Sequence, residues 1–153
     1  MTVPHGRYID LKKVTIYTDG ACQNNPGPGG YGAILICGSY RKEIYGGDPQ
    51  TTNNRMEIMG AIAALEMLKS ECEVEIYSDS RYLVDAIEKG WVVRWKANGW
   101  RRKKAPALNV DLWERLLPLL AKHKVRFRWM KGHTGHPENE RCDVLAKAAI
   151  AKL

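Results

Sequence analysis

Two aspartates in this sequence stand directly after segments that have the pattern of β-strands. Asp19 follows residues 14–18 (VTIYT), and Asp79 follows residues 73–77 (EVEIY) and one serine. Both segments alternate in polarity and are rich in β-branched or aromatic residues, which predicts strands. Ligands collect at the ends of central strands in open α/β sheets. The small residue after each aspartate, glycine or serine, leaves room for such a ligand.

Two further acids lie in segments with helical periodicity. Glu57 lies near the start of one such segment, and Asp143 lies in the last one, which begins at Pro137. Taken singly, acids at strand ends or in helices are most often caps or solvated groups. If the four converge, their charges repel, and protonation or a cation must offset the repulsion. Such oxygen ligands suit Mg²⁺ or Mn²⁺, and two ions about 4 Å apart could catalyse an in-line phosphoryl displacement.

The predicted elements place these acids in an α/β architecture. Strands are predicted at residues 14–18, 31–36, 42–45, 73–77 and 125–129. Helices are predicted from the cap residues 51–54 to about 68, at about 81–88, from 109–111 to about 122, and from 137 to the end. Three strands in a row and then alternating strands and helices indicate a mixed sheet. We expect helices on both faces and a reactive edge where the first and fourth strands end.

Length and composition favour an ordinary globular protein. The 153 residues, 44% of them hydrophobic, fit one domain over 1–153, with 1–11 as a short N-terminal extension. No window approaches the roughly 18 apolar residues of a membrane span, and we expect a cytoplasmic monomer. The four cysteines form no C-x-x-C pair, so the spacing suggests neither a zinc site nor a disulfide framework.

The positive charge of the chain is concentrated in one stretch. The net charge is +7, and residues 94–104 (RWKANGWRRKK) contain six basic residues and two tryptophans but no acid. A basic stretch of this kind favours a polyanionic partner such as a nucleic acid. Net charge alone does not identify that partner, because many basic proteins bind no nucleic acid.

Six blocks of this sequence resemble bacterial ribonuclease HI, the type 1 ribonuclease H family. The blocks are 17–22 (YTDGAC), 25–34 (NPGPGGYGAI), 51–57 (TTNNRME), 77–80 (YSDS), 109–113 (NVDLW) and 131–143 (KGHTGHPENERCD). They occur in the family's order, and the resemblance covers nearly the whole chain from about residue 12. It implies the ribonuclease H fold, a five-stranded mixed sheet with helices on both faces. It also implies an endonuclease that cuts the RNA strand of RNA–DNA hybrids with two Mg²⁺ ions, or Mn²⁺ as a substitute.

The resemblance also assigns catalytic roles. It implies that the metal-binding catalytic carboxylates are Asp19, Glu57, Asp79 and Asp143. His133 would transfer a proton or assist product release from the loop before the last helix. His136 is the alternative histidine, but the K-G-H spacing favours His133, and His136 with Pro137 then enters the helix. Glu57 has a second expected role, accepting a hydrogen bond from a ribose 2′-hydroxyl.

Contacts to the RNA strand would be made by small and amide residues. The resemblance implies sugar and minor-groove contacts at Gly20, Cys22, Asn24, Asn25, Asn53 and Asn54. Glycine brings backbone close to a ligand, and asparagine offers paired donors and acceptors. The 2′-hydroxyls that distinguish RNA lie in the wide minor groove. Ordinary turn chemistry is the alternative for Asn24 and the following Pro-Gly run.

Contacts to the DNA strand would lie elsewhere. Thr52 and Asn109 match a phosphate pocket and could also serve as helix N-terminal residues, where free N–H groups favour a phosphate. Some relatives carry an arginine at the place of Gln50. Residues 90–104 match the family's basic protrusion, with expected contacts from Trp91, Trp95, Lys96 and Trp100. The alternative is that the tryptophans hold a loop together beneath a solvated basic face.

The two-metal mechanism that the resemblance implies would hydrolyse the RNA strand and leave 5′-phosphate and 3′-hydroxyl ends. A catalytically silent module that binds hybrids or double-stranded RNA is the alternative from another class. Such a module predicts the loss of at least one carboxylate, and all four are present. A related nuclease of the same fold that cuts a DNA strand or a junction is the nearest competitor. The groove-reading asparagines and the basic protrusion argue against that competitor.

Overall fold

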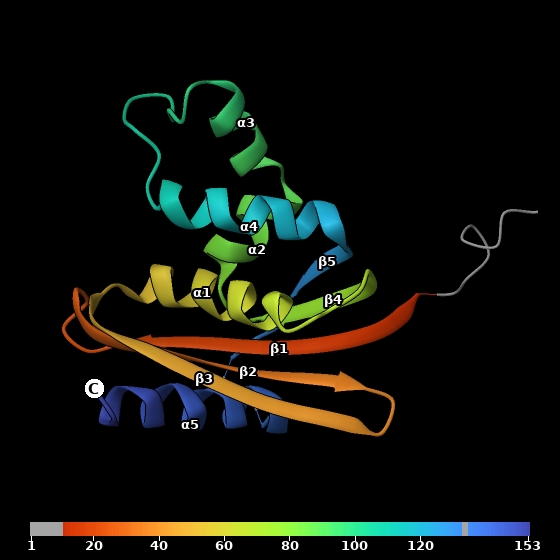
Figure 1. Cartoon of the computed structure of the whole chain (residues 1–153). Coiled ribbons are helices and arrows are strands. Elements are labelled where there is room, and N and C mark those ends of the chain that lie inside the picture. The colour runs from red at the N-terminus through yellow and green to blue at the C-terminus, as the bar shows by residue number, and fades with distance from the viewer. Residues whose placement is uncertain (1–10, 133–134) are drawn as a thin grey trace, which may run out of the picture.

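The computed structural model describes residues 11–132 and 135–153 (Figure 1). The strands in this part of the chain are β1 (Lys12–Cys22), β2 (Gly27–Cys37), β3 (Tyr40–Thr51), β4 (Cys72–Ser78) and β5 (Lys124–Trp129). The helices are α1 (Asn53–Glu66), α2 (Arg81–Glu88), α3 (Trp91–Ala97), α4 (Val110–Lys122) and α5 (Pro137–Ala151). Every strand and helix predicted from the sequence is confirmed.

The strands form one mixed sheet in the order β3-β2-β1-β4-β5. β1, β2 and β3 pair as an antiparallel meander, while β4 pairs parallel with β1 and β5 parallel with β4. The predicted α/β class and mixed sheet are therefore confirmed. Because β1 and β4 are parallel neighbours, the residues that follow them emerge at the same edge of the sheet.

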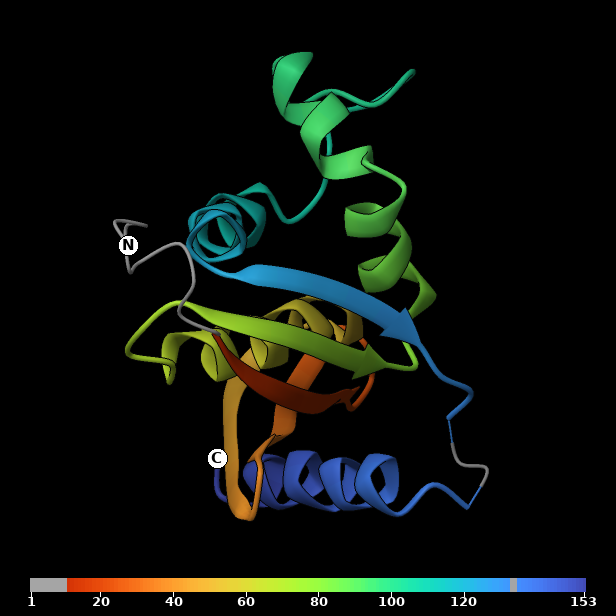
Figure 2. The same ribbon diagram turned by 90° about the vertical axis from the view of Figure 1, so that its right-hand side faces the viewer.

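Helices cover both faces of the sheet, as predicted (Figures 1 and 2). α5 lies alone on one face, against β1, β2 and β3, and α1 lies on the other. The larger core fills the space on the α1 side, where its fully buried side chains include Ile16, Ile58, Ile62, Leu65, Ile76 and Trp113. Burying an aliphatic side chain of this size stabilises the fold by roughly 1.5–3 kcal/mol.

Side-chain caps fix where the two helices beside the predicted reactive edge begin. Thr52 Oγ1 accepts a hydrogen bond from the N–H of Arg55 at 3.2 Å and caps α1. Ser80 Oγ accepts from the N–H of Leu83 at 3.1 Å and caps α2. Such caps satisfy N–H groups that have no partner within the helix. The cap residues therefore set the first turns from which neighbouring side chains face the sheet edge.

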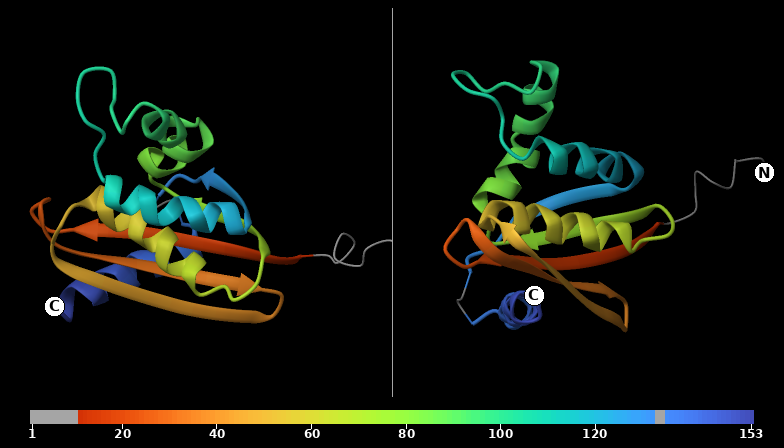
Figure 3. Two further views of the ribbon diagram at one scale, coloured as in Figure 1. Left: turned by 45° about the horizontal axis from the view of Figure 1, so that its top comes forward. Right: turned by 60° about the vertical axis from the view of Figure 1, so that its left-hand side comes forward.

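Three parts of the fold differ from the sequence-based prediction. β3 was predicted at residues 42–45 but ends at Thr51, because residues 46–51 continue the pairing with β2. β2 begins at Gly27 and not at residue 31, because the Gly-Pro-rich segment pairs with the end of β3 through its backbone. Residues 91–97 form helix α3, which was not predicted because aromatic and β-branched residues have weak helix propensity. The segment between α3 and α4 projects away from the sheet (Figure 3). No helix among the described residues is long and apolar enough to span a membrane.

Candidate active site

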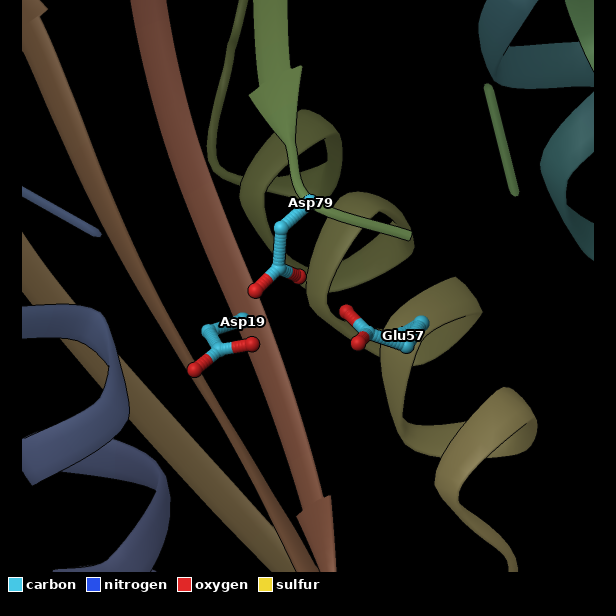
Figure 4. A group of neighbouring side chains, drawn as sticks. All are labelled: Asp19, Glu57 and Asp79. Carbon is cyan, nitrogen blue, oxygen red and sulfur yellow. The ribbon is translucent and has the colours of Figure 1, made fainter. Parts of the chain in front are cut away.

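Three of the four predicted carboxylates meet at the end of the sheet. Asp19 near the end of β1, Asp79 after β4 and Glu57 in α1 each offer an oxygen atom, and these atoms lie within 4.8 Å of one another. Figure 4 shows the three carboxylate groups directed toward one another from the three elements. The predicted convergence of these three acids is therefore observed.

Backbone pairing and one glycine produce this convergence. Tyr17 of β1 pairs with Tyr77 of β4, so both aspartates lie two residues beyond the same rung. A Cβ atom at Gly20 would lie 2.7 Å from the backbone nitrogen of Glu57, which is closer than real contacts allow. Glycine at this position therefore lets α1 approach β1 closely enough to place Glu57 beside Asp19.

Burial and mutual repulsion make this cluster electrostatically unfavourable without a cation. Asp19 and Glu57 are each 4% exposed. Burial, followed by the charges of Asp79 and Asp143, raises the pKa of Asp19 to about 8. Burial and the charges of Asp19 and Asp79 also raise the pKa of Glu57 well above its ordinary value. Among the described residues, Glu57 Oε1 is buried and has no hydrogen-bond donor. A hard divalent cation would relieve both costs, so the donor set fits Mg²⁺ or Mn²⁺.

The fourth predicted carboxylate lies at the rim of this cluster. Asp143 in α5 lines the same cavity as the other three, but its oxygens are not within the 4.8 Å group. Its Oδ2 atom lies 2.9 Å from Nζ of Lys147, one turn further along the helix. Arg141 of α5 pairs with Glu43 of β3 at 2.8 Å and ties this part of α5 to the sheet. Asp143 therefore faces the cavity with a lysine as its present counter-ion.

A cavity of about 430 Å³ holds these groups. Its lining residues are Asp19, Gly20, Asn53, Asn54, Glu57, Asp79, Ser80, Arg81, Tyr82 and Asp143. The predicted RNA-contact residues Gly20, Asn53 and Asn54 thus share the cavity with the carboxylates. Arg81 and Tyr82 were not among the predicted site residues, and their only sequence signal was their place directly after the Asp79-Ser80 pair.

His133 lies outside the described residues. Its neighbour Gly132 packs against the acidic cluster, since a Cβ there would lie 2.3 Å from Oδ2 of Asp79. Gly132 was not predicted as a site residue, although it stands inside the K-G-H motif. His136 occupies the N-cap position of α5, and its ring centroid lies 5.6 Å from that of Tyr17. The prediction that His136 and Pro137 enter the last helix is confirmed.

The other predicted RNA-contact residues lie at and after the end of β1. Asn25 Oδ1 accepts a hydrogen bond from the N–H of Asn53 at 3.0 Å, and Cys22 Sγ donates to the carbonyl of Thr51 at 3.4 Å. Asn24 is exposed and has a left-handed backbone with φ of 58°. The turn role left open for Asn24 is therefore present in the structure, whereas Asn25 and Cys22 brace the start of α1.

Thr52 and Asn109 are brought together by a residue that the sequence analysis missed. Arg55 donates its N–H to Thr52 Oγ1, and its guanidinium lies 3.4 Å from Asn109 Oδ1. The same guanidinium pairs with Asp111 at 2.7 Å. Asn109 precedes α4 with φ of 62°, and its amide donates to the hydroxyl of Tyr82 and does not cap the helix. Arg55 stood within the TTNNRME block, where it could have been found.

The three predicted tryptophan contacts are half-buried and pack against the main core. Ring centroids are 6.3 Å apart for Trp91 and Trp95, and 6.4 Å apart for Trp95 and Trp113 of α4. Lys96 is exposed, and its Nζ lies 3.9 Å from Glu114. The contacts of Trp91, Trp95 and Trp100 match the packing alternative, in which the tryptophans hold the basic segment on the domain.

Comparison with known proteins agrees with this fold and site. The RNase H family model matches residues 11–151. Ribonuclease H of Desulforamulus reducens is 61% identical over 141 residues, which cover 92% of this chain and 89% of that protein. Ribonuclease HI of Synechocystis sp. is 60% identical over 138 residues, covering 89% and 86% of the two chains.

Solved structures show the same architecture. LC9-RNase H1, described as a type 1 RNase H with the type 2 active-site motif, has a TM-score of 0.85 and 32% identity, covering 94% of this chain and 74% of that one. LC11-RNase H1, solved in complex with an RNA/DNA hybrid, has a TM-score of 0.69 and 26% identity, covering 91% and 97%. The fold and its acidic edge define a nuclease of the ribonuclease H class. The chain belongs to the ribonuclease H family and is a ribonuclease H.

Proposed function

We propose that this ribonuclease H hydrolyses the RNA strand of RNA–DNA hybrids and leaves 5′-phosphate and 3′-hydroxyl ends. The observation that carries the proposal is the cluster of Asp19, Glu57 and Asp79, whose oxygens lie within 4.8 Å of one another. The similarity to LC11-RNase H1, which was solved with an RNA/DNA hybrid, supports the choice of substrate. A silent binding module would have no reason to retain this repulsive group.

The metal proposed for this site is Mg²⁺, two ions per catalytic event, with Mn²⁺ as a substitute. Asp19, Glu57, Asp79 and Asp143 would hold it. When bound, the ions would activate water and stabilise the leaving ribose oxygen during in-line displacement. Glu57 Oε1 is buried and has no hydrogen-bond partner among the described residues, and this supports the assignment, since a divalent cation would satisfy it.

The residues around the carboxylates would position the RNA strand. Asn53 and Asn54 line the cavity and have amide groups suited to ribose and base edges in the minor groove. Gly20 would let the sugar–phosphate backbone approach, and Glu57 would accept a hydrogen bond from a 2′-hydroxyl. His133 is proposed to move a proton at the leaving oxygen or to assist product release.

The DNA strand would be bound on the far side of α1 and along the basic protrusion. Thr52 and Asn109, joined by Arg55, would hold one phosphate. The exposed cations after Trp100 would contact further phosphates, which gives affinity without sequence preference. We further propose that the chain acts as a one-domain monomer in the cytoplasm, with size-exclusion chromatography as the test of its oligomeric state.

A single labelled RNA strand tests this function. It is presented paired with DNA, paired with RNA and alone, with magnesium or with chelator, to the wild-type chain and to Asp19→Asn. We expect magnesium-dependent cutting of the hybrid alone, and none by the variant. Binding without cutting would support the silent module, and cutting of all three substrates would contradict the substrate assignment.

A further inference from the structure

The guanidinium of Arg81 lies over an aromatic ring at the edge of the carboxylate cavity. Its Cζ atom is 3.8 Å from the ring centroid of Trp129, at the end of β5. The indole N–H of Trp129 donates to the backbone oxygen of Asp79 at 3.1 Å, which fixes the ring beside the carboxylate cluster. Arg81 also lines the cavity that contains Asp19 and Glu57. A cation–π contact thus places a guanidinium next to the predicted reaction site.

Neither the helix dipole nor an ion pair with a described residue explains a cation at this position. Arg81 is the first residue of α2, where the helix dipole favours negative charge and disfavours positive charge. Among the residues that the structure describes, no carboxylate lies within ion-pair distance of its guanidinium. The nearby Asp79 carboxylate is directed toward Asp19 and Glu57 instead (Figure 4). The side chain is exposed, and its hydrogen-bonding edge is available to a ligand.

We propose that Arg81, held on Trp129, binds a phosphate of the RNA strand adjacent to the phosphate that is cut. This inference rests on the proposed function. A planar guanidinium matches the paired oxygens of a phosphate, and stacking limits its motion before the substrate arrives. The strand that reaches the carboxylates must pass the same cavity edge, so the phosphate belongs to the RNA strand. Arg81 would therefore be a positioning residue that supplies positive charge beside an acidic cluster.

Three variants separate this role from a general effect of charge. Arg81→Gln removes the charge, and Arg81→Lys keeps the charge but loses the planar, stacked group. Arg126→Gln is the matched control, because Arg126 is an exposed arginine that pairs with Glu88 on the outer edge of β5. Thermal melting of each variant establishes that the fold is retained. Kinetics are then measured with a hybrid at several salt concentrations.

We expect Arg81→Gln to raise KM about tenfold and to leave kcat nearly unchanged. An increase of this size corresponds to the loss of one charge-assisted hydrogen-bonding contact. The slope of log affinity against log salt should fall by about one unit. The increase in KM for Arg81→Lys should be more than half of the increase for Arg81→Gln. Arg126→Gln should change KM by less than about twofold. Equal effects of Arg81→Gln and Arg126→Gln, or a loss confined to kcat, would overturn the proposal.

Neutral phosphates identify the contact without relying on turnover. Hybrids that carry one methylphosphonate at successive RNA positions are titrated in an Asp19→Asn background, so that no strand is cut. We expect one RNA position at which the methylphosphonate weakens binding to the protein that retains Arg81. The same methylphosphonate should not weaken binding to the Arg81→Gln variant. The absence of such a position in the RNA strand, or its presence in the DNA strand, would overturn the inference.

The two proposals fail in different ways. A wild-type chain that cuts no hybrid would contradict the proposed function. A wild-type chain that cuts hybrids, together with an Arg81→Gln variant of equal KM, would contradict the role of Arg81 alone.

Discussion

The acidic edge of the sheet and the basic protrusion are built on opposite principles. At the edge, backbone pairing of β1 with β4 and the close approach at Gly20 force like charges together and bury them. In the protrusion, residues 101–104 are exposed cations spread over a segment that half-buried tryptophans hold on the core. Burial of like charges at the edge therefore lowers the stability of the metal-free fold and favours binding of a cation. The charges of the protrusion stay solvated, so they cost the fold little stability.

The largest effect should come from removing one acid at the edge. Asp19→Asn should lower turnover by at least about a thousandfold, equivalent to about 4 kcal/mol, because it removes a proposed metal ligand from the proposed reacting centre. Hybrid binding and folding should be retained, since the change leaves the protrusion intact. Single-turnover cleavage and fluorescence anisotropy measure the two properties. An active Asp19→Asn variant would contradict the proposal that the acidic edge carries catalysis while the protrusion carries binding.

The next effect concerns the stability of the metal-free protein. Because the pKa of Asp19 is raised from its ordinary 3.8 to about 8, the folded state binds its proton more tightly than the unfolded state. The associated stability is fully present below pH 3.8 and is lost as the pH rises toward 8. The loss should be on the order of 2–3 kcal/mol after allowance for relaxation of the buried group.

Melting curves between pH 5 and 8 in chelator test this expectation. Asp19→Asn should melt at a higher temperature than wild type near pH 8, and added Mg²⁺ should stabilise wild type more than the variant. A wild-type melting temperature that does not fall as the pH rises would contradict the unfavourable burial of charge inferred for this edge.

A smaller effect is expected from the protrusion. Replacement of Arg101, Arg102, Lys103 and Lys104 by glutamine should weaken hybrid binding at least about tenfold at low salt. It should also reduce the salt slope by up to about four units, because each phosphate contact contributes about one. The free energy of unfolding should change by less than about 0.5 kcal/mol, since the four side chains are exposed. A large loss of stability would show that the cations take part in the packing of the protrusion.

The smallest effect should come from Lys147, a cation that pairs with a proposed metal ligand. Lys147 contacts Asp143 at 2.9 Å, but its side chain is 69% exposed. Lys147→Gln should therefore tighten Mg²⁺ binding by only about twofold to threefold. Isothermal titration measures this change, with Lys89→Gln as control, because Lys89 pairs with Asp85 at the same helical spacing and does not line the acidic cavity. Equal changes in both variants would indicate a general effect of net charge.

Much of the fold could be predicted because its elements depend on local patterns. Strand alternation, the cap residues Thr52 and Ser80 and the apolar periodicity of α1 are all present within short windows of sequence. Helix α3 could not be predicted in this way, because it depends on tertiary contacts such as the packing of Trp95 on Trp113 of α4. The strand character of residues 27–30 depends on a partner in β3 and was missed for the same reason.

By itself, the sequence determined which residue types were available: four acids in recognisable motifs, a basic stretch with tryptophans, and the glycines that permit close approach. Only the tertiary structure decided that Asp19, Glu57 and Asp79 meet while Asp143 lies at the rim beside Lys147. It likewise joined Arg55 to Asn109 and laid Arg81 on Trp129. Distances between residues far apart in the chain depend on sheet register and on the packing of α1 and α5, and no local pattern in the sequence specifies either.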